Sequence, residues 1–394
     1  MPIARIDDKA AVKRVMEMIA IPGKSGDEKA IAQYIEKQLK SVGVKAAQIS
    51  YDTANKKSPI GGQIGNLIVK LPGTIKGPRR LLMGHIDTVP LCVGAVPVKK
   101  GKFIRPKGKD TALGGDNRAG ACVALTSAME ILKRKLPHPP LTLFFPIQEE
   151  IGLNGARWVT KSKLGNPKLC FNWDGGSTAV ATIGATGAFN MEIEVSGIAS
   201  HAGAHPENGV SAAVIAGKAI ASLEANGWHG AVKKGRKSGT SNIGVVTGGD
   251  ATNVVMPLVK VRAEARSHDA AFRRKIVAEF EKAFKAAAKS MKNAAGKSGS
   301  VKFAAEQRYE SFALSPKEPV VKAACEAIEA HGIEPVTKIS NGGLDANWLT
   351  NHGFPTVTLG CGQAAIHTVN EELHVPSFLE ACSIGLMLAT GAHD

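Results

Sequence analysis

Hydrophobic residues follow two kinds of pattern along the first part of the chain. Between about residues 9 and 42 they return every three or four positions, which predicts helical structure, and 119–133 repeats that pattern. Short apolar runs predict strands at 65–71, 81–83 and 141–147. The last of these is continuously apolar, as in a sheet that is covered on both faces. Alternating strands and helices predict an α/β sandwich with a largely parallel sheet.

The middle of the chain has a different pattern. Six elements are expected there in the order βαββαβ, at 187–195, 210–223, 241–246, 258–265, 270–292 and 301–309. Alternation of apolar and polar positions in the first strand predicts a sheet with one open face. After Ser315 the early pattern returns, with a helix, a strand and a helix at 318–331, 356–359 and 376–388. We therefore predict a discontinuous α/β domain of residues 1–184 and 313–394, interrupted by an α+β insertion of residues 185–312.

Composition narrows the class of protein. The chain is 44% hydrophobic and 21% charged, as in ordinary soluble proteins. No apolar run approaches the ~20 residues of a membrane span, and residues 1–8 lack the apolar core of a signal peptide. The six cysteines form no CxxC pair, which argues against a thiolate zinc site or a disulfide framework and favours a reducing compartment. We expect a cytoplasmic protein without a membrane partner.

A formal net charge of +16 raises the alternative of nucleic-acid binding. Much of the excess lies in 233–237 and in the segment 273–297. Neither stretch is interleaved with aromatic residues, which single-strand binders use for base stacking, and aromatics are only 5% of the chain. We interpret the charge as a solvated lysine-rich surface and expect no nucleic-acid partner.

The candidate chemistry begins where the apolar run 81–83 ends. His85 and Asp87 are two positions apart, so in an extended chain both side chains point to the same side. This lets the imidazole bind a metal while the carboxylate orients it. Further acids and a histidine follow other apolar or glycine-rich segments, namely Asp116, Glu149, Glu150, Asp174 and His367. The joint pattern predicts a metallohydrolase.

Each of these residues also has an ordinary structural explanation. Adjacent glutamates such as Glu149 and Glu150 usually lie in a solvated turn. Asp116 could cap the helix that follows it, and Asp174 before two glycines could be a turn residue. His367 alone would more often make a plain polar contact. Only their combination at the ends of predicted strands favours a metal site.

Several short motifs together resemble the M20 metallopeptidases, and within them the peptidase T-like (tripeptide aminopeptidase-like) branch. The resemblance runs from about residue 9 to 388 and rests on six segments, Gly84–Val89, Leu113–Gly120, Glu149–Gly152, Ser200–Gly203, Gly342–Asn347 and His367–Glu371. It implies that the discontinuous domain is a zinc-peptidase-like catalytic domain. The insertion would then be a lid domain, which often forms a homodimer in this family.

The resemblance also implies a ligand set for two divalent metal ions. Asp116 would bridge them, His85 and Asp174 would complete one site, and Glu150 and His367 the other. Nitrogen and carboxylate ligands suit Zn²⁺ and tolerate Mn²⁺ or Co²⁺. Two further residues would be catalytic, namely Glu149 as the general base for the bridging water and Asp87, which would orient the imidazole of His85.

Four more residues are expected to bind substrate by the same resemblance. His201 would donate to the substrate carbonyl, and Arg266 would recognise a substrate carboxylate with its guanidinium fork. Asn253 would bind substrate backbone. Gly343 lies in a turn that lets substrate backbone approach closely.

Within the family, Asp174 marks the peptidases of small peptides, because carboxypeptidases and deacylases usually have Glu there. We therefore expect removal of the N-terminal residue from a short peptide, such as a tripeptide. An M20-type carboxypeptidase or N-acyl-amino-acid amidohydrolase is the alternative, and a non-catalytic basic scaffold is a more distant one. Three features depart from the family pattern, namely Asn117 in place of a second acid, the segment Pro90–Val93 beside a segment that is commonly glycine-rich, and the strongly basic loop 99–109.

Overall fold

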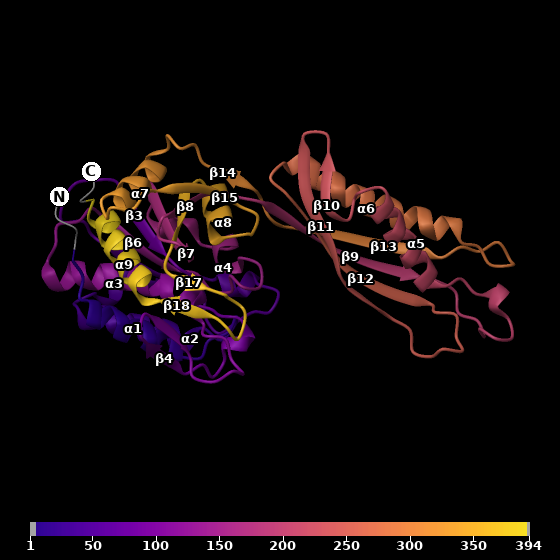
Figure 1. The fold of residues 1–394 in the computed structure, drawn as a ribbon, viewed down its shortest axis with the longest axis horizontal. Coiled ribbons are helices and arrows are strands. Elements are labelled where there is room, and N and C mark those ends of the chain that lie inside the picture. Colours follow the sequence, from indigo (N-terminus) through magenta and orange to yellow (C-terminus); the bar gives the residue numbers. More distant parts are fainter. Residues whose placement is uncertain (1–4, 392–394) are drawn as a thin grey trace. The chain divides into compact units, whose positions relative to one another are not determined.

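The protein folds into two compact units in a computed structural model that describes residues 5–391. Unit 1 comprises the chain up to Ala185 and from Ala313 onward, and unit 2 comprises Thr186–Phe312. The first four of the residues expected to lack a signal-peptide core lie outside the described part. Unit 1 is a mixed α/β fold and unit 2 a separate antiparallel α+β insertion, which confirms the predicted fold class (Figure 1).

Unit 1 is built on a nine-stranded sheet with the order β1-β2-β6-β3-β7-β16-β8-β14, in which β15 also pairs with β8. The strands are β1 Ile49–Tyr51, β2 Leu67–Leu71, β3 Arg80–Met83, β6 Leu141–Phe145, β7 Leu169–Gly175, β8 Val180–Ala185, β14 Phe312–Ala313, β15 Val336–Ser340 and β16 Thr356–Gly360. The four central strands β6, β3, β7 and β16 are parallel. β1 and β2 run antiparallel at one side, and β8 runs antiparallel to β16. The predicted parallel sheet is therefore found at the centre, where the carboxyl ends of the strands meet at one edge, and β15 and β8 form a further parallel pair outside it.

Alternate residues of the central strands enter two different cores. In β3, Leu82 packs into the large core with the helices α1, α2, α3, α7 and α9, whereas Leu81 and Met83 pack into a smaller core with α4 and α8. These helices are α1 Asp8–Ala20, α2 Lys29–Ser41, α3 Gly115–Arg134, α4 Asn154–Arg157, α7 Pro319–Glu329, α8 Asp345–Asn351 and α9 Val375–Thr390. The helical pattern predicted over 9–42 is divided into two helices. Pro22 and Gly23 stand in the break, where proline cannot continue a helix.

A small sheet with the order β17-β18-β5-β4 adjoins α3. It consists of β4 Pro97–Lys100, β5 Phe103–Pro106, β17 Gln363–Ala364 and β18 Glu372–His374. The basic segment 99–109, which we expected to be a loop, therefore contains most of a β-hairpin. Its exposed lysines hide the strand pattern, while Ile104 is fully buried. Lysines are common on exposed edge strands, where they prevent unwanted pairing.

Unit 2 is a five-stranded antiparallel sheet with the order β10-β11-β12-β9-β13. Its elements are β9 Gly187–Ser196, α5 Ala212–Ala225, β10 Gly230–Lys234, β11 Lys237–Gly248, β12 Leu258–Ser267, α6 Ala270–Ser290 and β13 Ser300–Tyr309. β10 is an additional strand that the βαββαβ prediction missed. The basic run 233–237 contains the turn of the β10–β11 hairpin, in which Gly235 has a positive φ of 62°.

One face of the unit 2 sheet is covered by the two helices. Ile215 and Leu223 of α5 and Phe280 and Phe284 of α6 form a single core with the inward residues of β9 and β12. The opposite face carries charged side chains such as Arg262. This agrees with the predicted open sheet face. Among the helices described here, none is both long and apolar enough to span a membrane.

Candidate metal centre

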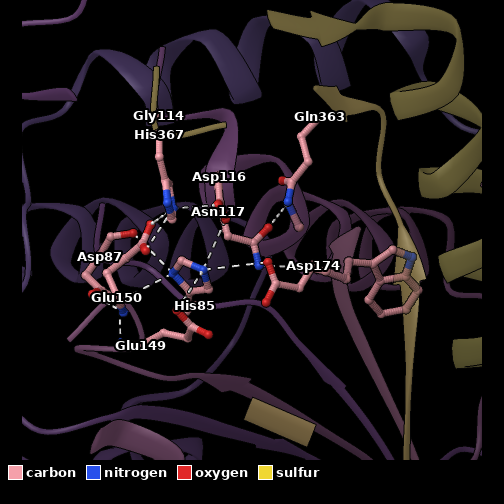
Figure 2. Close-up of polar contacts among 12 residues, drawn as sticks. His85, Asp87, Gly114, Asp116, Asn117, Glu149, Glu150, Asp174, Gln363 and His367 are labelled. Atoms are coloured by element: carbon pink, nitrogen blue, oxygen red, sulfur yellow. Dashed lines mark hydrogen bonds and ion pairs between the residues drawn. The ribbon is translucent and has the colours of Figure 1, made fainter. Parts of the chain in front are cut away.

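All five predicted metal ligands lie in unit 1, in segments that end or follow its strands. β3 ends at Met83, so His85 lies just past the strand rather than in it. Asp116 stands near the start of α3, and Glu150 follows β6. Asp174 is the second-last residue of β7, and His367 occupies the loop between β17 and β18. Figure 2 shows these side chains pointing toward one another.

The five side chains form two groups that share Asp116. In the first, His85 Nε2 lies 3.3 Å from Asp116 Oδ1 and 3.7 Å from Asp174 Oδ1. In the second, His367 Nε2 lies 3.1 Å from Asp116 Oδ2 and 2.9 Å from Glu150 Oε2. Within each group the potential ligand atoms are all within 4.8 Å of one another. The two carboxylate oxygens of Asp116 thus face different groups.

Asp87 connects the imidazole of His85 to the segment of the two glutamates. Its Oδ1 lies 3.3 Å from His85 Nδ1 and accepts the backbone N–H of Glu149 at 3.0 Å. Its Oδ2 accepts the backbone N–H of Glu150 at 3.2 Å and the hydroxyl of Ser25 at 2.6 Å. Burial opposes its ionisation, but the hydrogen bonds and charge of His85 and the bond from Ser25 keep the pKa of Asp87 below its ordinary value. Both carboxylate oxygens of the buried Asp87 therefore have polar partners.

Glu149 has a different environment from its neighbour Glu150. Its carboxylate belongs to neither ligand group, and its Oε2 is 3.9 Å from His85 Nε2. Burial, together with the charges of Asp174, Asp345 and Glu150, raises the pKa of Glu149 well above its ordinary value, although His85 opposes this. A raised pKa makes this carboxylate a better proton acceptor.

Burial and neighbouring charges together shift the pKa values of the other groups of the site. Burial lowers the pKa of His85, but Asp116, Asp174 and Asp87 outweigh it and raise the pKa well above the ordinary value. Asp116 and Glu150 raise the pKa of His367 to about 10. Burial raises the pKa of Asp174 to about 7 despite its bond to His85. The crowded carboxylates repel one another, which a bound cation would relieve.

The residues present fit two divalent metal ions. Asp116 Oδ1 is buried and forms no hydrogen bond, although it lies close to His85. Buried carboxylate oxygens are almost always hydrogen-bonded or bound to a metal. Imidazole nitrogens and carboxylate oxygens in groups of three suit Zn²⁺, with room in each set for water or substrate. The donor set therefore matches the expected two-metal site.

Three supporting residues were not identified from the sequence as part of the site. Ser25 holds Asp87, and Glu371 accepts three backbone N–H groups around Asp116. Asn117 donates from Nδ2 to the carbonyl of Trp173 at 2.6 Å and accepts the N–H of Gly120. A carboxylate could not donate this first bond, which explains why an amide is compatible with the position. Asn117 and Glu371 lie in motifs that drew attention for other residues, whereas no sequence signal points to Ser25.

A further acid, Asp345, lies in the Gly342–Asn347 motif. It is fully buried, and neither of its carboxylate oxygens has a hydrogen-bond partner. Burial and then the charges of Asp174, Asp87 and Glu150 raise its pKa well above the ordinary value, against the effect of His85. Gly343, which we expected to bind substrate, is half-buried in the loop just before α8 in the same unit.

The other predicted substrate-binding residues belong to unit 2. His201 is exposed, and its Nδ1 accepts the N–H groups of Gly203 and Ala204 at 3.2 and 3.1 Å. This places the ring proton of the neutral imidazole on Nε2, which is free to donate. Asn253 is exposed in a segment that pairs with the His201 loop, since its carbonyl accepts the N–H of Ala202.

Arg266 already binds a carboxylate in this structure. Its Nε and Nη2 donate to the two carboxylate oxygens of Glu264 at 3.0 and 2.9 Å. Burial disfavours the charged guanidinium, but Glu264 outweighs this effect and raises the pKa of Arg266. The fork geometry suits a carboxylate, as predicted, but a substrate carboxylate would have to replace Glu264.

Proteins similar to this chain include two of known structure. The chain is similar to the solved structure of a tripeptidase from Staphylococcus aureus subsp. aureus Mu50, at 28% identity and a TM-score of 0.88 over 98% of this chain and 99% of that one. It is also similar to aminopeptidase PepT from Bacillus cereus ATCC 10987, at 30% identity and a TM-score of 0.84 over 98% of each chain. Carboxypeptidase G2 from Pseudomonas sp. strain RS-16 is 27% identical over 94% of this chain and 86% of that protein.

The family assignment follows from a match along most of the chain. The model of peptidase family M20/M25/M40 matches residues 81–390, which include all five potential metal ligands, Glu149 and the whole of unit 2. The chain therefore belongs to peptidase family M20/M25/M40.

Proposed function

We propose that this M20-family hydrolase is a two-metal peptidase that removes the N-terminal residue of short peptides, with tripeptides as the expected substrates. The observation that carries the proposal is the pair of ligand groups that share Asp116. The similarity to a tripeptidase and to aminopeptidase PepT supports the choice of short peptides with a free N-terminus.

His85, Asp174 and Asp116 would hold one metal ion, and Glu150, His367 and Asp116 the other. Zn²⁺ suits this set best, with Mn²⁺ or Co²⁺ as alternatives. When bound, such a pair of ions lowers the pKa of water and polarises a carbonyl group.

Glu149 would be the general base. It lies beside His85 without belonging to either ligand group, so its carboxylate is available for proton transfer. We expect it to take a proton from the attacking water and to return it to the amine of the leaving peptide. Asp87 would act through its neighbours, because it orients the imidazole of His85 and fixes the backbone of both glutamates.

Residues of unit 2 would contribute to substrate binding. The Nε2 proton of His201 would be donated to the scissile carbonyl, Asn253 would bind substrate backbone, and Arg266 would exchange Glu264 for the substrate carboxylate. From unit 1, Gly343 would allow close approach of the substrate backbone. We also propose a homodimer through unit 2. A cytoplasmic location is proposed as well, and the six free cysteines support it.

The test compares a tripeptide with a free N-terminus and the same tripeptide acetylated at its N-terminus, with zinc-loaded protein. We expect cleavage of the free peptide only, with the first amino acid as product. Equal cleavage of both peptides would contradict an aminopeptidase.

A carboxypeptidase or N-acyl-amino-acid amidohydrolase is the second candidate, and similarity to carboxypeptidase G2 favours it. Both activities would use the same metal ligands and Glu149, but neither requires a free substrate amine. Release of the C-terminal residue from the acetylated tripeptide, or of acetate from an acetylated amino acid, would support this candidate over the aminopeptidase.

A further inference from the structure

Glu371 occupies an unusual position directly behind the candidate metal centre. It is fully buried, and Asp116 is the member of the centre that lies beside it. Its carboxylate accepts three backbone N–H groups from one short segment, those of Leu113 and Gly114 at Oε2 and that of Asp116 at Oε1, each at 2.9 Å. Hydrogen bonds to an ionised acceptor are roughly twice as strong as neutral ones. The segment that carries Asp116 is therefore held by one carboxylate.

The same residue also belongs to the turn that carries His367. The backbone N–H of Glu371 donates to the carbonyl of Thr368 at 3.1 Å, and this bond closes the turn just after His367. His367 in turn contacts Asp116 Oδ2 at 3.1 Å. Glu371 thus connects two segments that are about 250 residues apart in the sequence and whose side chains meet in the centre.

The Leu113–Asp116 segment is shaped for this close approach. Gly114 has a positive φ of 82°, which glycine adopts without strain. A methyl group added at Gly115 would lie 3.3 Å from Glu371 Oε1 and 3.5 Å from a methyl carbon of Leu113. The two glycines therefore let the backbone fold around the carboxylate, and a side chain at the second would press on it.

We propose that Glu371 is a positioning residue for the metal centre, which sets Asp116 so that each of its oxygens faces one ligand group. The inference rests on the proposed two-metal function. Because both groups share Asp116, its displacement would weaken both sites together. Neighbours that orient metal ligands typically contribute 10–100-fold to metal affinity.

The substitution Glu371→Gln tests this at constant size. An amide offers only one oxygen, so its NH₂ group must face at least one of the three N–H donors. Glu372→Gln is the matched control, because this next residue is half-buried and pairs with Arg105 instead. Gly115→Ala disturbs the same contact from the other side. Its control is Gly217→Ala in α5, where an added methyl group meets nothing within 4 Å.

The measurement is competition for Zn²⁺ between metal-free protein and a chromophoric chelator, with folding checked by circular dichroism. We expect Glu371→Gln to weaken binding at both sites by roughly 10–100-fold, Gly115→Ala to weaken it less, and both controls to match wild type. If Glu371→Gln does not fold, Gly115→Ala decides by the same titration.

Wild-type affinity in a folded Glu371→Gln protein would overturn the inference while leaving the proposed function intact. Weakening at one site alone would overturn the argument that Glu371 acts through the shared Asp116. A wild-type protein that binds no Zn²⁺ would overturn the proposed function itself, and the same titration shows this.

Discussion

Replacing the buried Glu28 by glutamine should make the metal-free protein more stable at neutral and alkaline pH. The Glu28 side chain is fully buried, and its Oε1 accepts the N–H of Gly26 at 2.7 Å, whereas its Oε2 has no hydrogen-bond partner. Burial and the charge of Asp87 raise the pKa of Glu28 from 4.5 to about 7, against the effect of backbone hydrogen bonds. Glutamine keeps the acceptor for Gly26 and is neutral at every pH.

The magnitude follows from the difference between the folded and unfolded pKa values. The folded chain binds the proton of Glu28 more tightly than the unfolded chain, so the free energy of unfolding falls as pH rises from about 4.5 to 7. Each pKa unit corresponds to about 1.4 kcal/mol, so the loss approaches about 3 kcal/mol above pH 7. The variant should therefore exceed wild type by about 3 kcal/mol at pH 8 and match it near pH 4.

The assay is urea denaturation of both proteins with a chelator present, at several pH values between 4 and 8. Glu329→Gln at an exposed position of α7 controls for the loss of one negative charge. A stability difference for Glu28→Gln that does not grow with pH would refute the reasoning. It would mean that the buried guanidinium of Arg118, whose pKa responds to Glu28, compensates the anion.

Three further substitutions have defined outcomes. Asn117→Asp places a carboxylate against the carbonyl of Trp173, so the free energy of unfolding in urea should fall by at least about 1–3 kcal/mol. A loss no larger than that of Asn117→Ala would contradict electrostatic repulsion. Asp87→Asn turns an NH₂ group toward the N–H donor of either Glu149 or Glu150, so kcat/KM for a tripeptide should fall by roughly 10–100-fold. Unchanged kinetics would remove Asp87 from the account. Phe280→Ala leaves a cavity in the unit 2 core and should lower the free energy of unfolding by about 3–5 kcal/mol in urea or thermal melts. A change below about 1 kcal/mol would show that this core collapses around the cavity.

Most ligand-bearing segments could be predicted because the ligand lies at or just beyond the end of an apolar strand, or follows a glycine pair. Parallel strands end at the same edge of a sheet, so Glu150 after β6 and Asp174 in β7 come near His85 after β3. Continuous apolar runs also identified β3 and β6 correctly. Local periodicity predicted α6 almost to its ends, with 270–292 expected and Ala270–Ser290 found.

What could not be predicted depends on distant or exposed contacts. The three N–H groups that Glu371 accepts lie about 250 residues earlier in the chain, and hydrogen-bond pairing of this kind leaves no local pattern. Lysines on the exposed β4–β5 hairpin and on β10 hid the alternation typical of strands. The edge strand β15 was missed for a related reason, because its residues Val336–Lys338 are exposed on both sides.

The most direct test of the two-metal account is a joint measurement on wild type and Glu149→Gln. Bound metal per chain is determined after zinc loading, and hydrolysis of a free tripeptide is followed in the same samples. The account predicts two metal ions per chain in both proteins and a loss of turnover by roughly 10²–10⁴-fold in the variant, because Glu149 moves the proton without holding a metal. Fewer than two ions in wild type, or a variant that cleaves the tripeptide as fast as wild type, would contradict it.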